Sequence, residues 1–365
     1  MSAASPEDTV FCVLSFEGPD AYSLSGGLGT RVKELVLALA GRGFETHLYF
    51  TGDPALPAEE VRAGVHYHRW SQWLSRHHPQ GVYAGEEAKV DDWVRSLPLH
   101  LIETLVEPAA RRGQRVVVMA EEWQTASTLT RLAQALWVRG LRGWVVALWN
   151  ANNLYGFDRV DFRQLASVAL ITTVSRYMKH RMWAWSVNPV VIPNGIPAAW
   201  LKVPPAASVK ALRAAGGPGF FGFKIGRFDP DKRWLMAVSA AALLKRRQGR
   251  VKLLIRGGPE AHGAEVLGSA VAEGLSVVDA PAPATAAGLA RLLRAHPEAD
   301  LLNLTSYVPE AVARTVYAAA DAVLANSGHE PFGLVGLEVM SAGGLAVTGA
   351  TGEDYALAYR NAIVI

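Results

Sequence analysis

The stretches VFCVLSF (residues 10–16), LGTRVKELVLALAG (28–41) and THLYF (46–50) decide the fold class. Short, continuous apolar runs are typical of strands that are buried on both faces. Leucine, valine and alanine spaced three and four residues apart predict an amphipathic helix, here ending at Gly41. A strand, a helix and a second strand in this order form a right-handed crossover, which predicts a parallel sheet covered by helices on both faces.

The same alternation continues along the chain. In the first half we expect further strands at Arg115–Ala120, Gly143–Trp149, Val168–Val174 and Val190–Ile192. After residue 200 the pattern restarts, with a helix at Trp234–Arg247 and strands at Phe220–Ile225, Val251–Ile255, Asp300–Leu304, Ala322–Ala325 and Ala346–Thr348. Residues 204–219, rich in proline, alanine and glycine, are interpreted as a linker or a variable loop, and Ala280–Ala287 as another loop.

The prediction is an α/β protein of two doubly wound, Rossmann-like domains, residues 1–200 and 201–365, facing each other across a cleft. Each domain should bind ligands at the carboxyl ends of its strands, and a cleft between two domains is a common ligand site. At this level a dehydrogenase, a kinase and a transferase fit equally well.

Composition narrows the class of protein. Of 365 residues, 50% are hydrophobic and 19% charged, and the formal net charge of +3 is too small to favour nucleic acid or a membrane surface as a partner. The sequence lacks a run long enough to span a bilayer and a signal-peptide pattern, so we expect a cytoplasmic protein with its single cysteine, Cys12, in the core. Because Asn361–Ile365 is an apolar, strand-like run, we expect the natural protein to be longer, or another chain to cover this run.

Two loops that each follow a first strand carry groups suited to phosphate. Ser25–Gly29 (SGGLG) precedes a helix, and glycines there let the backbone approach an anion at the positive end of the helix dipole. On its own, this loop is equally compatible with a plain turn. In Gly226–Lys232 (GRFDPDK), Arg227 and Lys232 lie where both can reach a diphosphate, although two solvated charges around a turn would have the same pattern.

The segment His329–Glu338 (HEPFGLVGLE) carries the most specific chemistry. Glu330 precedes a proline and should be extended, so the helix is expected to begin near Gly333. The amides of Gly333, Leu334 and Val335 then have no partner within the helix and can bind a phosphate. Glu330 and Glu338 are carboxylates that suit sugar hydroxyls, because each accepts several hydrogen bonds. For either glutamate alone, a surface or capping role is the commoner one.

Taken together, these motifs resemble the retaining glycosyltransferases of family 4, close to the starch and glycogen synthases. The family's Glu-x7-Glu motif matches at Glu330 and Glu338, and its Arg-x4-Lys pair matches at Arg227 and Lys232. Further matches are the Gly-Gly-Leu loop at Gly26–Leu28, the Pro-Asn-Gly-Ile turn at Pro193–Ile196, and Glu121–Ala126 (EEWQTA).

The resemblance implies the glycosyltransferase-B (GT-B) fold, with the donor bound by the second domain and the acceptor by the first. Arg227 and Lys232 would neutralise the leaving diphosphate, and Glu330 would hold the transferred sugar. Glu338 would bind the ribose, and the remaining donor-binding residues would be Gly26, Gly27, Gly333, Leu334 and Val335. The anomeric configuration would be kept, with the leaving phosphate accepting the acceptor's proton. Cofactor and metal are not expected, because arginine and lysine can stabilise the leaving charge.

The acceptor side is expected in the first half, where ten of the eleven tryptophans lie. Trp123 and Trp149, at strand ends, are the acceptor candidates, although packing in the core is the commoner role of a tryptophan. Asn150 is a third candidate. It follows the strand where many relatives carry a histidine, and an amide cannot titrate near neutral pH.

Three functions remain open from the sequence. The first is a retaining transferase that moves a hexose, taken to be glucose, from a nucleoside-diphosphate sugar to a carbohydrate acceptor. The second is a nucleotide-sugar epimerase on the same fold, which needs no acceptor. The third is a non-catalytic fragment that binds a nucleotide sugar.

Overall fold

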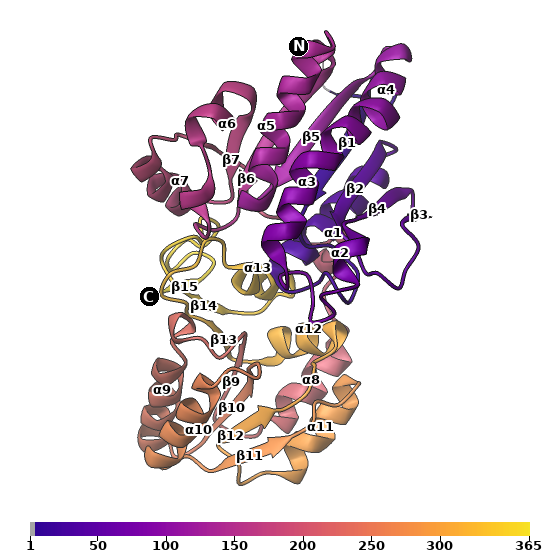
Figure 1. The fold of residues 1–365 in the computed structure, drawn as a ribbon. Coiled ribbons are helices and arrows are strands. Elements are labelled where there is room, and N and C mark those ends of the chain that lie inside the picture. Colours follow the sequence, from indigo (N-terminus) through magenta and orange to yellow (C-terminus); the bar gives the residue numbers. More distant parts are fainter. Residues whose placement is uncertain (1–3) are drawn as a thin grey trace. The chain divides into compact units, whose positions relative to one another are not determined.

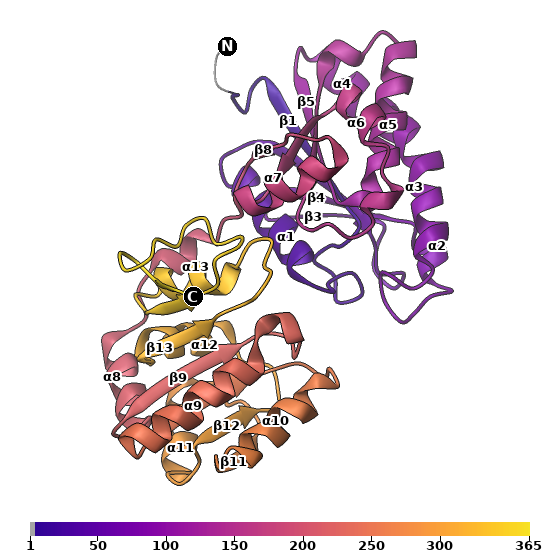
Figure 2. The ribbon, with the colours of Figure 1, turned by 90° about the vertical axis from the view of Figure 1, so that its left-hand side faces the viewer.

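The computed structural model describes residues 4–365. The chain divides into two compact units, Met1–Gly195 and Ile196–Ile365, so the division lies within the Pro193–Ile196 turn and slightly before the boundary expected after residue 200. Each unit is a parallel sheet with helices on both faces (Figures 1 and 2), which confirms the predicted fold class. Among residues 4–365, helices that are long and apolar enough to cross a membrane are absent.

The first unit contains an eight-stranded sheet in the order β3-β4-β2-β1-β5-β6-β7-β8, parallel except for β3. Its strands are β1 Thr9–Ser15, β2 Glu45–Thr51, β3 Glu59–Arg62, β4 Val65–Trp70, β5 Arg115–Glu121, β6 Val145–Ala151, β7 Leu170–Thr173 and β8 Val190–Val191. Its helices are α1 Gly27–Ala40, α2 Gln72–Ser75, α3 Glu86–Leu101, α4 Glu107–Arg111, α5 Trp123–Val138, α6 Phe162–Val168 and α7 Arg176–Met182, with a π-helical turn at Ile102–Val106.

Alternation along β2 shows how the first sheet is covered. Leu48 and Phe50 pack with Val32 and Val36 of α1 on one face. Tyr49, between them, points to the other face, where its hydroxyl lies 3.4 Å from Nε2 of His100 in α3. The helix α3 packs against α5 on that second face (Figure 2). As expected, Cys12 is fully buried in β1.

The second unit contains a seven-stranded, all-parallel sheet in the order β11-β12-β10-β9-β13-β14-β15. Its strands are β9 Phe220–Ile225, β10 Val251–Arg256, β11 Val277–Ala280, β12 Leu301–Leu304, β13 Ala322–Ala325, β14 Ala346–Thr348 and β15 Ile363–Val364. Its helices are α8 Ala206–Ala215, α9 Trp234–Gln248, α10 His262–Ala272, α11 Ala286–Ala295, α12 Glu310–Ala319 and α13 Leu334–Ser341. One apolar cluster joins β9 to α8, α11 and α12, and a second joins the sheet to α9 and α10.

One expectation about local structure was wrong, and one local feature was missed. Residues 206–215, expected in a linker, form helix α8, because Leu212 and Ala215 lie on one face that packs into the core of the second unit. The hairpin of β3 and β4 was not predicted. β3 is mostly exposed, and its short, charged sequence Glu59–Arg62 lacks the apolar run of a buried strand.

The topology places two loops of each unit at one sheet edge. In the second unit, β9 lies between β10 and β13, so the strand order reverses at this point. Parallel strands end at the same edge, so the loops after β9 and β13 meet there. In the first unit, β1 lies between β2 and β5, and the loops after β1 and β5 meet in the same way.

Candidate functional site

The loop after β9 presents Arg227 to solvent. Gly226 has a φ of +152°, a backbone conformation that favours glycine, and the next residue is Arg227. Arg227 is exposed, and within residues 4–365 its side chain has no hydrogen bond or ion pair. Its carbonyl accepts a hydrogen bond of 2.7 Å from Nε1 of Trp234, and Phe228 is buried against the Trp234 ring. The backbone of this loop is therefore held in place, while the guanidinium of Arg227 remains available to bind a ligand.

Lys232 and Glu330 form an ion pair that joins the two loops. Nζ of Lys232 donates to Oε2 of Glu330, and their side chains are 27% and 18% exposed. Asp229 caps the intervening turn by accepting from the amide of Asp231 at 2.9 Å. The amide of Gly328 donates to the carbonyl of Asp231 at 2.6 Å. The structure therefore brings together the lysine and the glutamate that the sequence placed 98 residues apart.

The helix that follows Glu330 begins where expected. α13 starts at Leu334 with Gly333 as its N-cap, and Gly333 offers no side-chain hydrogen bond to the first turn. Gly333, Leu334 and Val335 are partly exposed. The amide of Glu330 is held by Oγ1 of Thr351 at 2.9 Å. Glu330 thus lies beside the positive end of the helix dipole, which stabilises negative charge there.

Glu338 lies one turn inside the same helix. Its Oε2 accepts a hydrogen bond of 3.1 Å from the hydroxyl of Tyr317, and its burial raises the carboxyl pKa. Burial and the nearby Glu338 charge raise the pKa of Tyr317 as well, so this hydroxyl remains a donor. Glu330 and Glu338 therefore occupy different depths, one beside Lys232 and one beside Tyr317.

Lys224 and Glu353 belong to this sheet edge and were missed from the sequence. Lys224, near the end of β9, is 2% exposed and donates to Oδ1 of Asn326 at 2.6 Å, and its Nζ lies 5.0 Å from the Trp234 ring centre. Burial, with the charge of Lys232, lowers the pKa of Lys224 to about 7. The apolar pattern that predicts the strand β9 does not indicate that a lysine within it is buried at a site. Glu353 follows β14 and approaches Gly333.

In the first unit, the glycine loop already holds a carboxylate. Oε2 of Glu17 accepts hydrogen bonds from the amides of Gly26 and Gly29, each at 3.0 Å, and its Oε1 accepts one of 2.5 Å from the hydroxyl of Tyr83. Two of the amides at this helix start therefore bind a side chain instead of standing free. At Gly27 an added Cβ would meet nothing within 4 Å, so this part of the loop remains open.

The two tryptophans expected to contact an acceptor lie in the core, which corrects their predicted role. Trp149 is fully buried and its Nε1 donates to the carbonyl of Glu122 at 2.9 Å. Trp123 is 6% exposed, and the guanidinium of Arg159 lies 4.6 Å from its ring centre. Their faces are not available to stack on a sugar ring. Both rings therefore pack in the core of the first unit.

Asn150 belongs to a polar network at the ends of β5 and β6. Its Nδ2 donates to Oε2 of Glu121 at 2.9 Å, and its Oδ1 accepts from Oγ1 of Thr172 at 2.9 Å. Arg31, from α1, binds Glu121 and also donates to Oδ1 of Asn194 at 2.8 Å. With both of its amide groups occupied, Asn150 fixes Glu121 and is itself 3% exposed.

The neighbouring Glu122 is a second unusual carboxyl in this network. Its φ is +64°, its carboxyl oxygen accepts from the amide of Asn152 at 2.8 Å, and burial raises its pKa to about 8. A positive φ outside glycine is a strained conformation that the surrounding contacts must hold. This edge of the first unit therefore carries a buried, polar and partly strained cluster.

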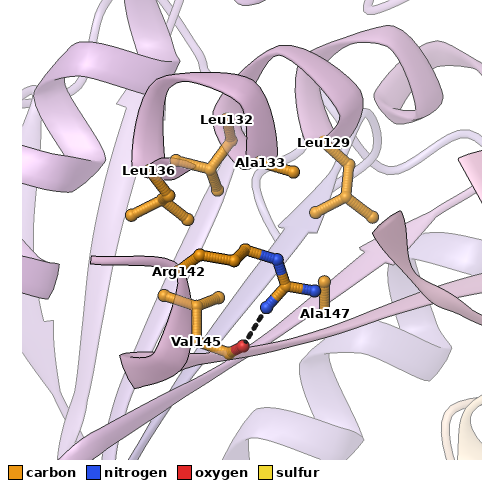
Figure 3. A pocket seen from close by; sticks show the side chains of 7 residues that line it. All are labelled: Leu129, Leu132, Ala133, Leu136, Arg142, Val145 and Ala147. Atoms are coloured by element: carbon orange, nitrogen blue, oxygen red, sulfur yellow. Dashed lines mark hydrogen bonds between the residues drawn. The ribbon is translucent and has the colours of Figure 1, made fainter. Parts of the chain in front are cut away.

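A small apolar recess lies elsewhere in the first unit, beneath α5 and at the start of β6 (Figure 3). It is lined by Leu129, Leu132, Ala133, Leu136, Arg142, Val145 and Ala147. The guanidinium of Arg142 turns to the carbonyls of Val145 and Val168, at 2.6 and 2.8 Å. Because this recess lies at the amino end of β6, it is separate from the polar cluster at the carboxyl end. Groups of three or more His, Cys, Asp or Glu residues placed to hold a metal are absent from residues 4–365.

Comparisons with known proteins match both units. The family model described as Glycosyltransferase Family 4 matches residues 25–200, and the model described as Glycosyl transferases group 1 matches residues 213–354. A search of curated protein sequences returned no match.

Solved structures with a similar fold include two synthases. Sucrose-phosphate synthase from Thermosynechococcus elongatus is 18% identical, with 98% of this chain and 86% of that chain covered at a TM-score of 0.64. The catalytic domain of starch synthase IV from Arabidopsis thaliana, bound to ADP and acarbose, is 15% identical, with 99% and 88% covered at a TM-score of 0.64. The Anabaena protein HepE in complex with UDP is 14% identical, with 98% and 85% covered at a TM-score of 0.59.

The matched models cover one unit each, and the solved structures match over both units. The resemblance drawn from Glu330, Glu338, Arg227 and Lys232 is thereby confirmed at the level of family and fold. The chain belongs to the family 4 glycosyltransferases and has the GT-B fold, with a starch synthase among its structural neighbours.

Proposed function

We propose that the chain is a retaining hexosyltransferase that moves glucose from a nucleoside-diphosphate sugar to a carbohydrate acceptor. The observation that carries the proposal is the Lys232–Glu330 ion pair beside the exposed Arg227 at the start of α13. This arrangement combines two cations, a helix start and a carboxylate at one sheet edge. A nucleotide sugar presents the matching groups, namely a diphosphate and a ring of hydroxyls.

The charge of each residue suggests which part of the donor it binds. Arg227 and Lys232 bind the diphosphate, where negative charge grows as the bond to the sugar breaks. The free amides at the start of α13 add to this stabilisation without needing to reorient. Glu330 accepts hydrogen bonds from hydroxyls of the transferred hexose and keeps Lys232 in position when the donor is absent. Glu338, deeper in the helix, binds the ribose hydroxyls.

Retention follows from having the acceptor attack on the face that the diphosphate leaves. The leaving phosphate oxygen then accepts the acceptor's proton, the bond from the anomeric carbon to that oxygen breaks, and the new glycosidic bond forms on the same face. The first unit supplies the acceptor site. The ADP and UDP in the starch synthase and Anabaena structures support a nucleoside diphosphate as the leaving group here.

The proposal is tested by a thermal-shift screen of uridine, adenosine and guanosine diphosphate sugars, followed by turnover of the best binder. A donor that binds the folded state raises Tm by mass action. With an added sugar acceptor, we expect a glycoside and free nucleoside diphosphate. Isomerised donor sugar in the absence of acceptor would instead identify an epimerase, and binding without turnover a binding module.

A further inference from the structure

The loop that follows β14 returns to the amino end of α13 and places Glu353 there. Glu353 is 6% exposed, although it belongs to a loop. Its Oε2 accepts a hydrogen bond of 3.1 Å from the amide of Thr351, the residue whose hydroxyl holds the amide of Glu330. One loop thus positions two carboxyl groups, Glu330 and Glu353, beside the same helix start.

The second oxygen of Glu353 points at this helix start and has no partner. A Cβ built on Gly333 would lie 2.8 Å from Oε1 of Glu353, so this oxygen occupies the space that a side chain at position 333 would fill. Oε1 is buried and has no hydrogen-bond partner within residues 4–365. Buried polar atoms nearly always have a partner, because an unpaired one costs the free energy of its lost hydration. A ligand held at this helix start would supply the missing partner of Oε1.

The surroundings of Glu353 define the chemistry of that ligand. Burial and the negative charge of Glu330 raise the pKa of Glu353 to about 7, against the backbone hydrogen bonds from its own amide and from Thr351 and the charge of Lys232. The proposed partners of the diphosphate are the cations Arg227 and Lys232 and the amides at the start of α13, so Oε1 of Glu353 is left for another part of the donor. An uncharged hydroxyl is favoured, because it can donate to a carboxylate or accept from a protonated carboxyl.

We propose that Glu353 is a further specificity-determining residue of the donor site and that its free Oε1 hydrogen-bonds one hydroxyl of the transferred hexose. The inference rests on the proposed function, since it requires a sugar held beside Glu330. A purely structural Glu353 would affect stability without distinguishing one sugar from another. A Glu353 that hydrogen-bonds the sugar instead makes donor affinity depend on one particular hydroxyl.

The test is donor binding measured by titration calorimetry, with a nucleoside-diphosphate glucose, the same donor lacking one hydroxyl at a time, and the nucleoside diphosphate alone. In wild type, we expect one of the deoxy donors to bind about tenfold more weakly than the parent donor. In Glu353→Ala, the parent donor should weaken by about tenfold and that discrimination should vanish, while binding of the nucleoside diphosphate stays unchanged. Glu353→Gln, which keeps a donor and an acceptor, should retain part of the discrimination.

Asp300 provides a matched control in the same unit. It is a carboxyl of similar burial, 8% exposed, and accepts from the amide of Ser276 at 2.8 Å, but it lies at the amino end of β12. Asp300→Asn should lower Tm and leave the discrimination between donors intact. Equal discrimination in wild type and Glu353→Ala, with both variants folded, overturns the inference. If wild type binds none of the nucleotide sugars, the proposed function itself fails.

Discussion

Replacing Lys232 with methionine removes the positive charge beside the leaving diphosphate and keeps most of the side-chain volume. In the absence of donor, the substitution leaves Glu330 without its partner. The two side chains are partly buried, 27% and 18% exposed. The stabilisation lost with this ion pair should therefore lie between that of a surface ion pair and that of a buried one. We expect the free energy of unfolding to fall by about 1 kcal/mol.

The effect on turnover should be much larger than the effect on stability. Removing one preorganised group that stabilises a developing negative charge costs about 10²–10³ in kcat, or about 2.7–4 kcal/mol. The assay is steady-state release of nucleoside diphosphate from the donor, with thermal melting of the same preparations. Lys232→Arg should recover part of kcat because it restores the charge.

Lys245 supplies the matched control. Its Nζ pairs with Asp300 at 2.7 Å, with side chains 36% and 11% exposed, at the amino edge of the same sheet. Lys245→Met should therefore lower Tm about as much as Lys232→Met and leave kcat at the wild-type value. The reasoning is refuted if Lys232→Met, folded and saturated with donor, keeps kcat within threefold of wild type.

Three further predictions concern other parts of the molecule. Gly27→Ala should leave Tm unchanged or raise it, since Cβ meets nothing within 4 Å, yet weaken donor binding in calorimetry; unchanged affinity would remove Gly27 from the donor site. Glu338→Gln should keep the bond from Tyr317 and raise KM for the donor by about tenfold, and a KM equal to wild type would contradict the ribose role. Acid should destabilise the first unit through His68, whose pKa is lowered from 6.5 to about 3 by burial and by His47, His100 and His66. Because the unfolded chain binds the proton first, the unfolding free energy should fall as pH drops from about 6.5 towards 3, by up to about 1.4 kcal/mol per pH unit, and His68→Phe should flatten this slope in urea titrations.

Local patterns predicted the parts of the fold that depend on local chemistry. The limits of β9, β13 and β14 follow from apolar runs bounded by polar or glycine residues, and the start of α13 follows from Pro331 and Gly333. The contact between Lys232 and Glu330 was not predicted; it follows from the strand order, which places β9 beside β13.

Features that depend on distant contacts could not be predicted in this way. The α8 sequence, rich in alanine, shows its amphipathic face only against the rest of the second core. The burial of Trp149 depends on contacts with Phe157 and Phe162, which stand beyond its own strand. Glu353 becomes part of the site because its loop folds back over Gly333, a contact across 20 residues that lacks a sequence signature.

The central claim is that the chain transfers a hexose from a nucleoside-diphosphate sugar with retention. Proton nuclear magnetic resonance can follow the anomeric signal while uridine, adenosine and guanosine diphosphate glucose are each offered with a panel of sugar acceptors. We predict loss of one α-linked donor, release of its nucleoside diphosphate and growth of an α-linked product, all suppressed in Lys232→Met. A β-linked product would contradict retention, and intact donors across the whole panel would contradict the transferase assignment.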